Sequence, residues 1–143
     1  MKKRTLALFM AACLVCTSIS VSAAEEAAFS VSGMTTEYLQ DPVGIEADSV
    51  HFGWQMDSGI IGKMQSAYQI QVYRAGNDEP VWDSGKVESS DSVGIPYGGG
   101  TPLEEGTAYQ WTVTVWDEDG VSVTSDMGTF ETGVSNQDTW QNA

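Results

Sequence analysis

The sequence predicts an all-β domain built as a sandwich of two sheets. Apolar and polar residues alternate in several short runs, and Gly, Asp, Asn and Pro separate these runs. No stretch keeps the 3.6-residue apolar period of a helix. Alternation places the apolar side chains on one face of each strand, so we expect two sheets that are each wet on one side.

Seven strands are expected, four with strong alternation and three fainter ones. In chain order they lie near residues 29–34, 49–56, 67–74, 81–84, 92–97, 108–116 and 121–131. The residues expected to face the core are Val50, Phe52, Trp54, Met56, Tyr68, Ile70, Val72, Val93, Ile95, Tyr97, Tyr109, Trp111, Val113 and Val115. Seven short strands are typical of an immunoglobulin or fibronectin type III-like β-sandwich.

Two local features fit such a sandwich. Leu103 precedes Tyr109 by six residues across a turn that contains Gly, the spacing of a tyrosine corner, in which the hydroxyl contacts upstream backbone. Asp119 and Gly120 suit the positive φ angles of a two-residue hairpin turn. Three aromatic residues are therefore expected to be structural: Trp54, Tyr109 and Trp111.

The first 23 residues have the pattern of a secretory signal. Three basic residues precede an apolar centre at 6–15, and small residues lead to an expected cleavage after Ala23. Thr and Ser interrupt the apolar run, which favours cleavage over a membrane anchor, and lipoprotein processing at Cys13 is the alternative. The mature chain is expected to be secreted or on the surface of a bacterium, with residues 24–34 as leader and first strand.

The exported chain is strongly acidic and has no cysteine. The whole sequence has a formal net charge of -14, and the expected cleavage removes three of its basic residues and none of its 20 acidic ones. This balance disfavours nucleic acid and anionic membranes as partners. Cys13 and Cys16 both lie in the expected signal, so packing must stabilise the mature domain without a disulfide.

The sequence contains no pattern that predicts catalysis. The acidic pairs Glu104/Glu105 and Asp117/Asp119 lie at predicted turns, whereas acid–base catalysis by two carboxyl groups needs them to face each other across a substrate pocket. The one histidine, His51, lies on an outward strand face without the pattern of a nucleophile or zinc site. Calcium at the aspartate pair is disfavoured by its spacing. No catalytic residue, cofactor or metal is expected.

Three aromatic residues are candidates for contact with a partner. Tyr73 and Trp116 break the inward alternation on two strands that are expected to be neighbours, and Trp82 lies on a short segment nearby. Exposed aromatic residues that cluster mark interaction sites. Three interpretations stay open, namely a sugar-stacking platform, burial against a neighbouring domain and, for Trp82, a plug at the edge of the sandwich.

Six short motifs follow one another along the chain: Pro42-Val43-Gly44-Ile45, Phe52-x-Trp54, Gln65-x-Ala67-Tyr68, Trp82-Asp83-Ser84-Gly85-Lys86, Tyr109-x-Trp111 and Phe130-Glu131-Thr132-Gly133. In order and in approximate spacing they resemble the fibronectin type III-like module that opens bacterial α-L-rhamnosidases. The resemblance covers residues 35–133, and six motifs in order are specific where one would be weak.

The resemblance implies a non-catalytic accessory module of a secreted α-L-rhamnosidase-like glycoside hydrolase, which positions or stabilises catalytic domains. Residues 134–143 are then expected to be a linker to a following domain that this chain lacks, together with the catalytic barrel. Expected partners are neighbouring domains of a longer chain or rhamnose-containing glycans. The alternative is a stand-alone carbohydrate-binding or surface-adhesion domain.

Overall fold

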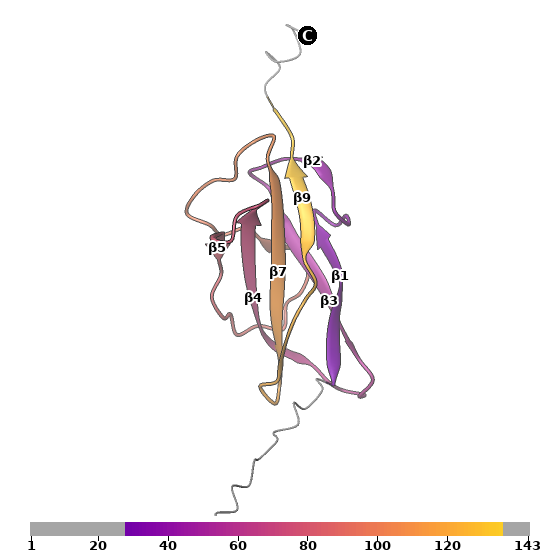
Figure 1. Cartoon of the computed structure of the whole chain (residues 1–143). Coiled ribbons are helices and arrows are strands. Elements are labelled where there is room, and N and C mark those ends of the chain that lie inside the picture. The colour runs from indigo at the N-terminus through magenta and orange to yellow at the C-terminus, as the bar shows by residue number, and fades with distance from the viewer. Residues whose placement is uncertain (1–27, 136–143) are drawn as a thin grey trace, which may run out of the picture.

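The computed structural model describes residues 28–135, which form strands and turns (Figure 1). Within this range no helix is long and apolar enough to cross a membrane. The expected signal peptide at 1–23 and residues 136–143 of the expected linker lie outside the described residues. The strands are β1 (Phe29–Thr36), β2 (Val43–Ile45), β3 (His51–Ser58), β4 (Gln65–Arg74), β5 (Pro80–Asp83), β6 (Ile95–Pro96), β7 (Ala108–Asp117), β8 (Ser122–Thr124) and β9 (Gly128–Thr132).

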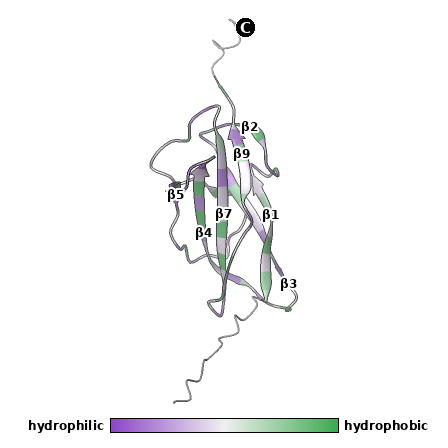
Figure 2. Ribbon diagram, in the orientation of Figure 1, coloured by the Kyte–Doolittle hydropathy of each residue, from purple (hydrophilic) through white to green (hydrophobic). Residues whose placement is uncertain are grey.

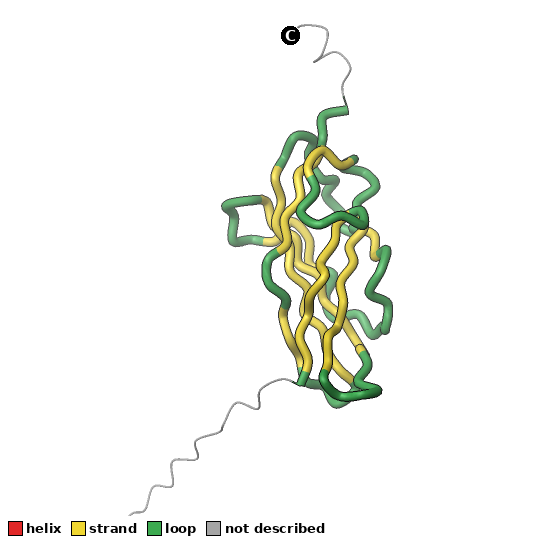
Figure 3. Tube along the Cα trace, turned by 90° about the vertical axis from the view of Figure 1, so that its right-hand side faces the viewer, coloured by secondary structure: helices red, strands yellow, loops and turns green. Residues whose placement is uncertain are grey.

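The strands form two sheets that face each other, which confirms the predicted sandwich. The smaller sheet has the order β1-β3-β6, and the larger has the order β2-β9-β7-β4-β5. Strand β8 also pairs with β7, beside its C-terminal half, while β9 pairs with its N-terminal half. Figure 3 shows the elongated sandwich turned by 90°, with the strands running along its length and the loops at both ends and along its sides.

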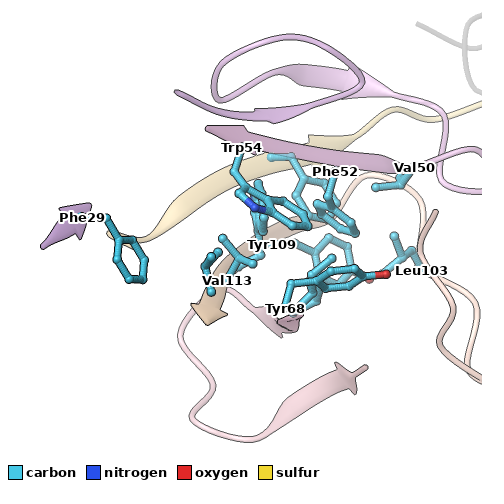
Figure 4. Close-up of a cluster of buried hydrophobic side chains, with 13 residues drawn as sticks. Phe29, Val50, Phe52, Trp54, Tyr68, Leu103, Tyr109 and Val113 are labelled. Atoms are coloured by element: carbon cyan, nitrogen blue, oxygen red, sulfur yellow. The ribbon is translucent and has the colours of Figure 1, made fainter. Parts of the chain in front are cut away.

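The core lies between the two sheets and is built from the alternating apolar residues of β3, β4 and β7 (Figure 2; Figure 4). Phe52 is central, with its ring centroid 4.6 Å from that of Trp111 and 6.0 Å from that of Phe130. The buried indole of Trp54 donates a 2.9 Å hydrogen bond to Oε1 of Gln65, so its polar atom is satisfied.

Tyr109 connects the core to the loop that precedes β7. Its hydroxyl accepts a 2.8 Å hydrogen bond from the backbone N–H of Glu104, so the ring contacts upstream backbone, as the spacing predicts. The ring itself stacks on Phe130, with centroids 5.2 Å apart. Nearby Leu103 is buried in the same cluster.

The strand predicted at 92–97 is wrong in length and in part of its orientation. Only Ile95–Pro96 pairs regularly with β3, and Val93 is 67% exposed instead of facing the core. Gly94 has a φ of 68°, a left-handed conformation that breaks the extended backbone and turns Val93 outward. Ile95 and Tyr97 are partly buried against the core.

The described residues contain nine strands instead of the predicted seven, and two features account for the difference. The region predicted as one strand at 121–131 is divided into β8 and β9, and the three-residue strand β2 pairs in parallel with β9. The predicted two-residue turn at Asp119 and Gly120 is also wrong. Residues 118–121 connect β7 to β8, and of these only Gly120 has a positive φ, at 81°.

Candidate functional site

Trp82 points into the sandwich at the edge of the larger sheet. Its partner across β4 and β5 is Val72, which is fully buried, and cross-strand partners share a face of the sheet. The indole stacks on Phe52 with centroids 6.1 Å apart and meets the edge of Tyr97 at 5.1 Å. This geometry favours the interpretation of Trp82 as a plug at the edge of the core.

Tyr73 and Trp116 lie on the outer face of the larger sheet but far from each other. Tyr73 is paired with Gln110 near the N-terminal end of β7, and Trp116 is paired with Ala67 near the start of β4. Ala67 and Tyr73 are six positions apart on β4, which corresponds to about 20 Å along the strand. The two aromatic side chains therefore do not form one platform.

The ring of Trp116 is already covered by a cation. The ammonium nitrogen of Lys86 lies 4.9 Å from the ring centroid, within the range of a cation–π interaction. Ala67, the cross-strand partner of Trp116, is fully buried although it points to the outer face. A sugar ring that stacked on this side of the indole would have to displace Lys86.

The outer face between these aromatic residues is polar and internally hydrogen-bonded. The side-chain amides of Gln69 and Gln71 donate to the two carboxylate oxygens of Asp83, at 2.8 and 3.0 Å. Burial raises the pKa of Asp83, but these hydrogen bonds and one from a backbone N–H outweigh it, so the pKa lies below its ordinary value. The hydroxyls of Thr114 and Thr124 are 2.8 Å apart. Many polar groups of this face are thus already paired.

The first acidic pair, Glu104 and Glu105, has separate structural partners. The carboxylate of Glu104 lies 2.7 Å from Nη2 of Arg74, in an exposed ion pair. Glu105 accepts hydrogen bonds from the backbone N–H and the hydroxyl of Ser135. Glu105 thereby connects the loop before β7 to the segment after β9.

The second acidic pair, Asp117 and Asp119, is bridged by Lys63 from the β3–β4 loop. The Lys63 ammonium lies 2.8 Å from Oδ2 of Asp117 and 2.7 Å from Oδ2 of Asp119. Burial raises the pKa of Asp117, but Lys63 and the backbone N–H groups of Val121 and Asp119 outweigh it, and the pKa falls below its ordinary value. The hydrogen bonds to both carboxylates in turn raise the pKa of Lys63.

This bridge places an ammonium where a calcium ion between the two aspartates would lie. Across residues 28–135, no group of three or more His, Cys, Asp or Glu side chains is arranged to hold a metal ion. His51, the remaining polar candidate, lies with Nδ1 2.7 Å from Oε1 of Glu37, and its backbone N–H donates to the same oxygen at 2.7 Å. The histidine thus connects the start of β3 to the end of β1.

A cavity at one end of the sandwich was not found by sequence reasoning. It has a volume of about 540 Å³ and lies between three segments, residues 44–48, 102–105 and 133–135. These segments are far apart in the sequence and only the fold brings them together. We name this cavity the end groove.

Comparison with known proteins places the described sandwich in one family. The family described as the Rha78A-like, N-terminal immunoglobulin domain matches residues 31–136. An α-L-rhamnosidase of Streptomyces avermitilis is 44% identical over 117 residues, which cover 79% of this chain and 11% of the relative. An α-L-rhamnosidase of Formosa agariphila is 38% identical over 109 residues, covering 72% of this chain and 11% of the relative.

Solved structures agree with the sequence relatives. The S. avermitilis α-L-rhamnosidase, solved in complex with L-rhamnose, superposes with a TM-score of 0.72 over 79% of this chain and 11% of that chain, at 44% identity. The α-L-rhamnosidase of Dictyoglumus thermophilum gives a TM-score of 0.70 over 78% of this chain and 13% of that chain, at 33% identity. This chain thus spans about a tenth of the length of the relatives it matches, and it belongs to the Rha78A-like family of N-terminal immunoglobulin domains.

Proposed function

We propose that this domain is a non-catalytic accessory module of an α-L-rhamnosidase-like glycoside hydrolase and that it stabilises or positions the domains that follow it. The observation that carries the proposal is the 44% identity and TM-score of 0.72 to the matching part of the S. avermitilis enzyme. The chain matches 11% of that enzyme, so most of the relative has no counterpart in this chain.

The proposed place of action is outside the cytoplasm. It rests on the first 23 residues, whose basic start, apolar centre and small-residue end have the pattern of a cleaved signal. The acidic composition, 20 Asp and Glu against 6 Lys and Arg, agrees with this proposal, because a net charge far from zero keeps an exported protein soluble. N-terminal sequencing of the exported protein tests this: a start at Ala24 supports it, and retention of Met1 contradicts it.

The role itself is tested by domain exchange. In the S. avermitilis enzyme, the matching N-terminal domain is either deleted or replaced by residues 24–143 of this chain. We expect deletion to shorten the half-life of activity on an aryl α-L-rhamnoside at elevated temperature, and the exchange to restore most of it. A deleted enzyme with unchanged half-life and kcat/KM, or an exchanged enzyme no better than the deleted one, would contradict an accessory role.

Experiments on the isolated chain distinguish this proposal from a stand-alone sugar-binding domain. The covering of Trp116 by Lys86 and the separation of Tyr73 from Trp116 disfavour a stacking platform. We therefore expect the isolated chain to hydrolyse no aryl rhamnoside and to show no change in tryptophan fluorescence with millimolar L-rhamnose. A saturable change that Trp116→Ala abolishes would make sugar binding the better proposal.

A further inference from the structure

The end groove lies where the polypeptide leaves the sandwich. Gly133, Val134 and Ser135, the residues that follow β9, form one of its walls. A second, adjoining cavity of about 270 Å³ shares Ala47, Asp48, Pro102 and Leu103 with the groove and extends it toward β3. Any polypeptide attached after residue 135 therefore begins at the rim of this groove.

The walls of the groove are held in place by backbone contacts on both sides. The N–H of Gly133 donates to the carbonyl of Ile45 at 2.8 Å, and its carbonyl accepts from the N–H of Gly106 at 3.2 Å. Thr132 is buried, and its hydroxyl donates to the carbonyl of Glu104 at 2.6 Å. A Cβ at position 133 would lie 3.0 Å from the carbonyl oxygen of Gly44, so the strands approach closely. The groove is consequently preformed.

The lining of the groove combines apolar side chains with carboxylates that have no cationic partner among the described residues. Its apolar side chains include Ile45, Ala47 and Leu103, and of these Leu103 is buried and belongs to the core cluster. Glu46 and Asp48 also line it, and neither forms an ion pair with a residue of the described chain. No Lys, Arg or His contributes to its lining within residues 28–135.

We propose that the end groove seats a basic side chain, Arg or Lys, from the part of a longer chain that follows this sandwich. This inference rests on the proposed accessory role. Lys and Arg place an aliphatic stem on apolar surface and a cation among carboxylates, which matches the two kinds of lining. Complementary charge also fixes the register of a contact, so the groove would set the orientation of the following domain.

The test uses charge reversal in the exchanged S. avermitilis enzyme described above. Asp48→Lys places a cation in the lining of the groove. The matched control is Asp91→Lys, because Asp91 is also exposed but lies on the loop between β5 and β6, where its carbonyl accepts a hydrogen bond from the side-chain amide of Gln65. We expect Asp48→Lys to shorten the half-life at elevated temperature about tenfold, because a cation would face a cation at the solvent-exposed rim of the groove. The difference from the control should shrink in about 0.5 M NaCl, where the Debye length is only a few ångströms.

The isolated chain provides the folding control. Asp48 is exposed and has no cationic partner there, so Asp48→Lys should melt at the same temperature as the wild type or slightly higher. If the exchanged enzyme is stable and Asp48→Lys behaves like Asp91→Lys, the groove inference is overturned while the accessory role stands. If the exchanged enzyme is no better than the deleted one, the accessory role fails instead. Dimerisation of the isolated chain that Asp48→Lys abolishes would also overturn the inference, since the occupant would be a second copy.

Discussion

The two faces of strand β7 share one backbone but differ in burial and in the kind of contact that their side chains form. On the inner face Tyr109, Trp111, Val113 and Val115 are at most 3% exposed. On the outer face the alternate residues are Gln110, Thr112, Thr114 and Trp116, all half-buried. The inner residues pack in the apolar core between the two sheets. On the outer face, the hydroxyl of Thr114 is hydrogen-bonded to that of Thr124, and the ring of Trp116 lies under the ammonium of Lys86. Substitutions on the two faces should therefore differ greatly in cost.

The largest effect is expected on the inner face, from Trp111→Ala. Removal of a fully buried Trp costs about 3 to 5 kcal/mol, a large part of the total stability of a small domain. We expect partial unfolding at about 37 °C, measured by a thermal melt monitored by circular dichroism. Thr112→Ala, one residue away on the outer face, should change stability by no more than about 0.5 kcal/mol. Equal melting temperatures for the two variants would abolish the distinction between the faces.

A second substitution adds volume to the inner face instead of removing it. A Cβ on Gly128 would lie 2.7 Å from the indole nitrogen of Trp111, and the buried ring cannot move away without disturbing the core. Gly128→Ala should cost about 1 to 3 kcal/mol through overpacking. Gly59→Ala is the control, because nothing lies within 4 Å of its added Cβ. Urea denaturation of both variants measures the difference, and a Gly128→Ala protein as stable as the control would contradict the close approach.

The inner face ends at a charged residue, and this exception predicts a pH dependence. Asp117 is buried, and its pKa is lowered chiefly because Lys63 and backbone N–H groups outweigh the effect of burial. A lowered pKa stabilises the fold above the ordinary carboxyl value of about 3.9, and this contribution is lost as the pH falls through the folded pKa. Asp117→Asn should cost about 1 to 2 kcal/mol at neutral pH.

The measurement is a pair of urea titrations, one at neutral pH and one at the most acidic pH at which the wild type is still folded. The gap in stability between wild type and Asp117→Asn should be widest at neutral pH and should narrow in acid. A gap that is independent of pH would mean that the carboxylate charge has no role in the loop contact.

The smallest effect is expected on the outer face, at the cation over Trp116. Lys86→Ala should cost about 0.5 to 1 kcal/mol, the size of an exposed cation–π interaction, and shift the fluorescence of the indole. Lys86→Arg keeps the cation and should retain the wild-type spectrum and stability. A loss of stability in Lys86→Arg as large as that in Lys86→Ala would show that a cation–π interaction with Trp116 is not the source of the stabilisation.

The long alternating runs could be predicted from the sequence because each has a buried and a wet face. Val50, Phe52 and Trp54, as well as the inner residues of β7, are buried as expected. Val93 differs because alternation assumes a regular strand, and the left-handed Gly94 breaks it. Strand β2 has only three residues, too short for periodicity to be visible, and it exists because it pairs with β9.

The candidate surfaces were harder to predict than the strands. The positions of Tyr73 and Trp116 on the outer face follow from alternation, but their separation depends on the register of β4 against β7. Trp82 faces inward because β5 pairs with β4 so that Trp82 meets Val72, a long-range fact that a short segment does not reveal. The end groove joins three distant segments, so neither composition nor spacing could indicate it.

The clamped backbone at Gly133 has a consequence for the entropy of assembly. A flexible connection would let an attached domain sample many orientations, all of which must be given up when it docks. Here the last strand is fixed by hydrogen bonds to residues on both sides of it. An attached segment thus starts from a fixed point with a fixed direction, which raises its effective concentration at the groove. A contact that is weak between separate molecules is then sufficient to hold two domains of one chain together.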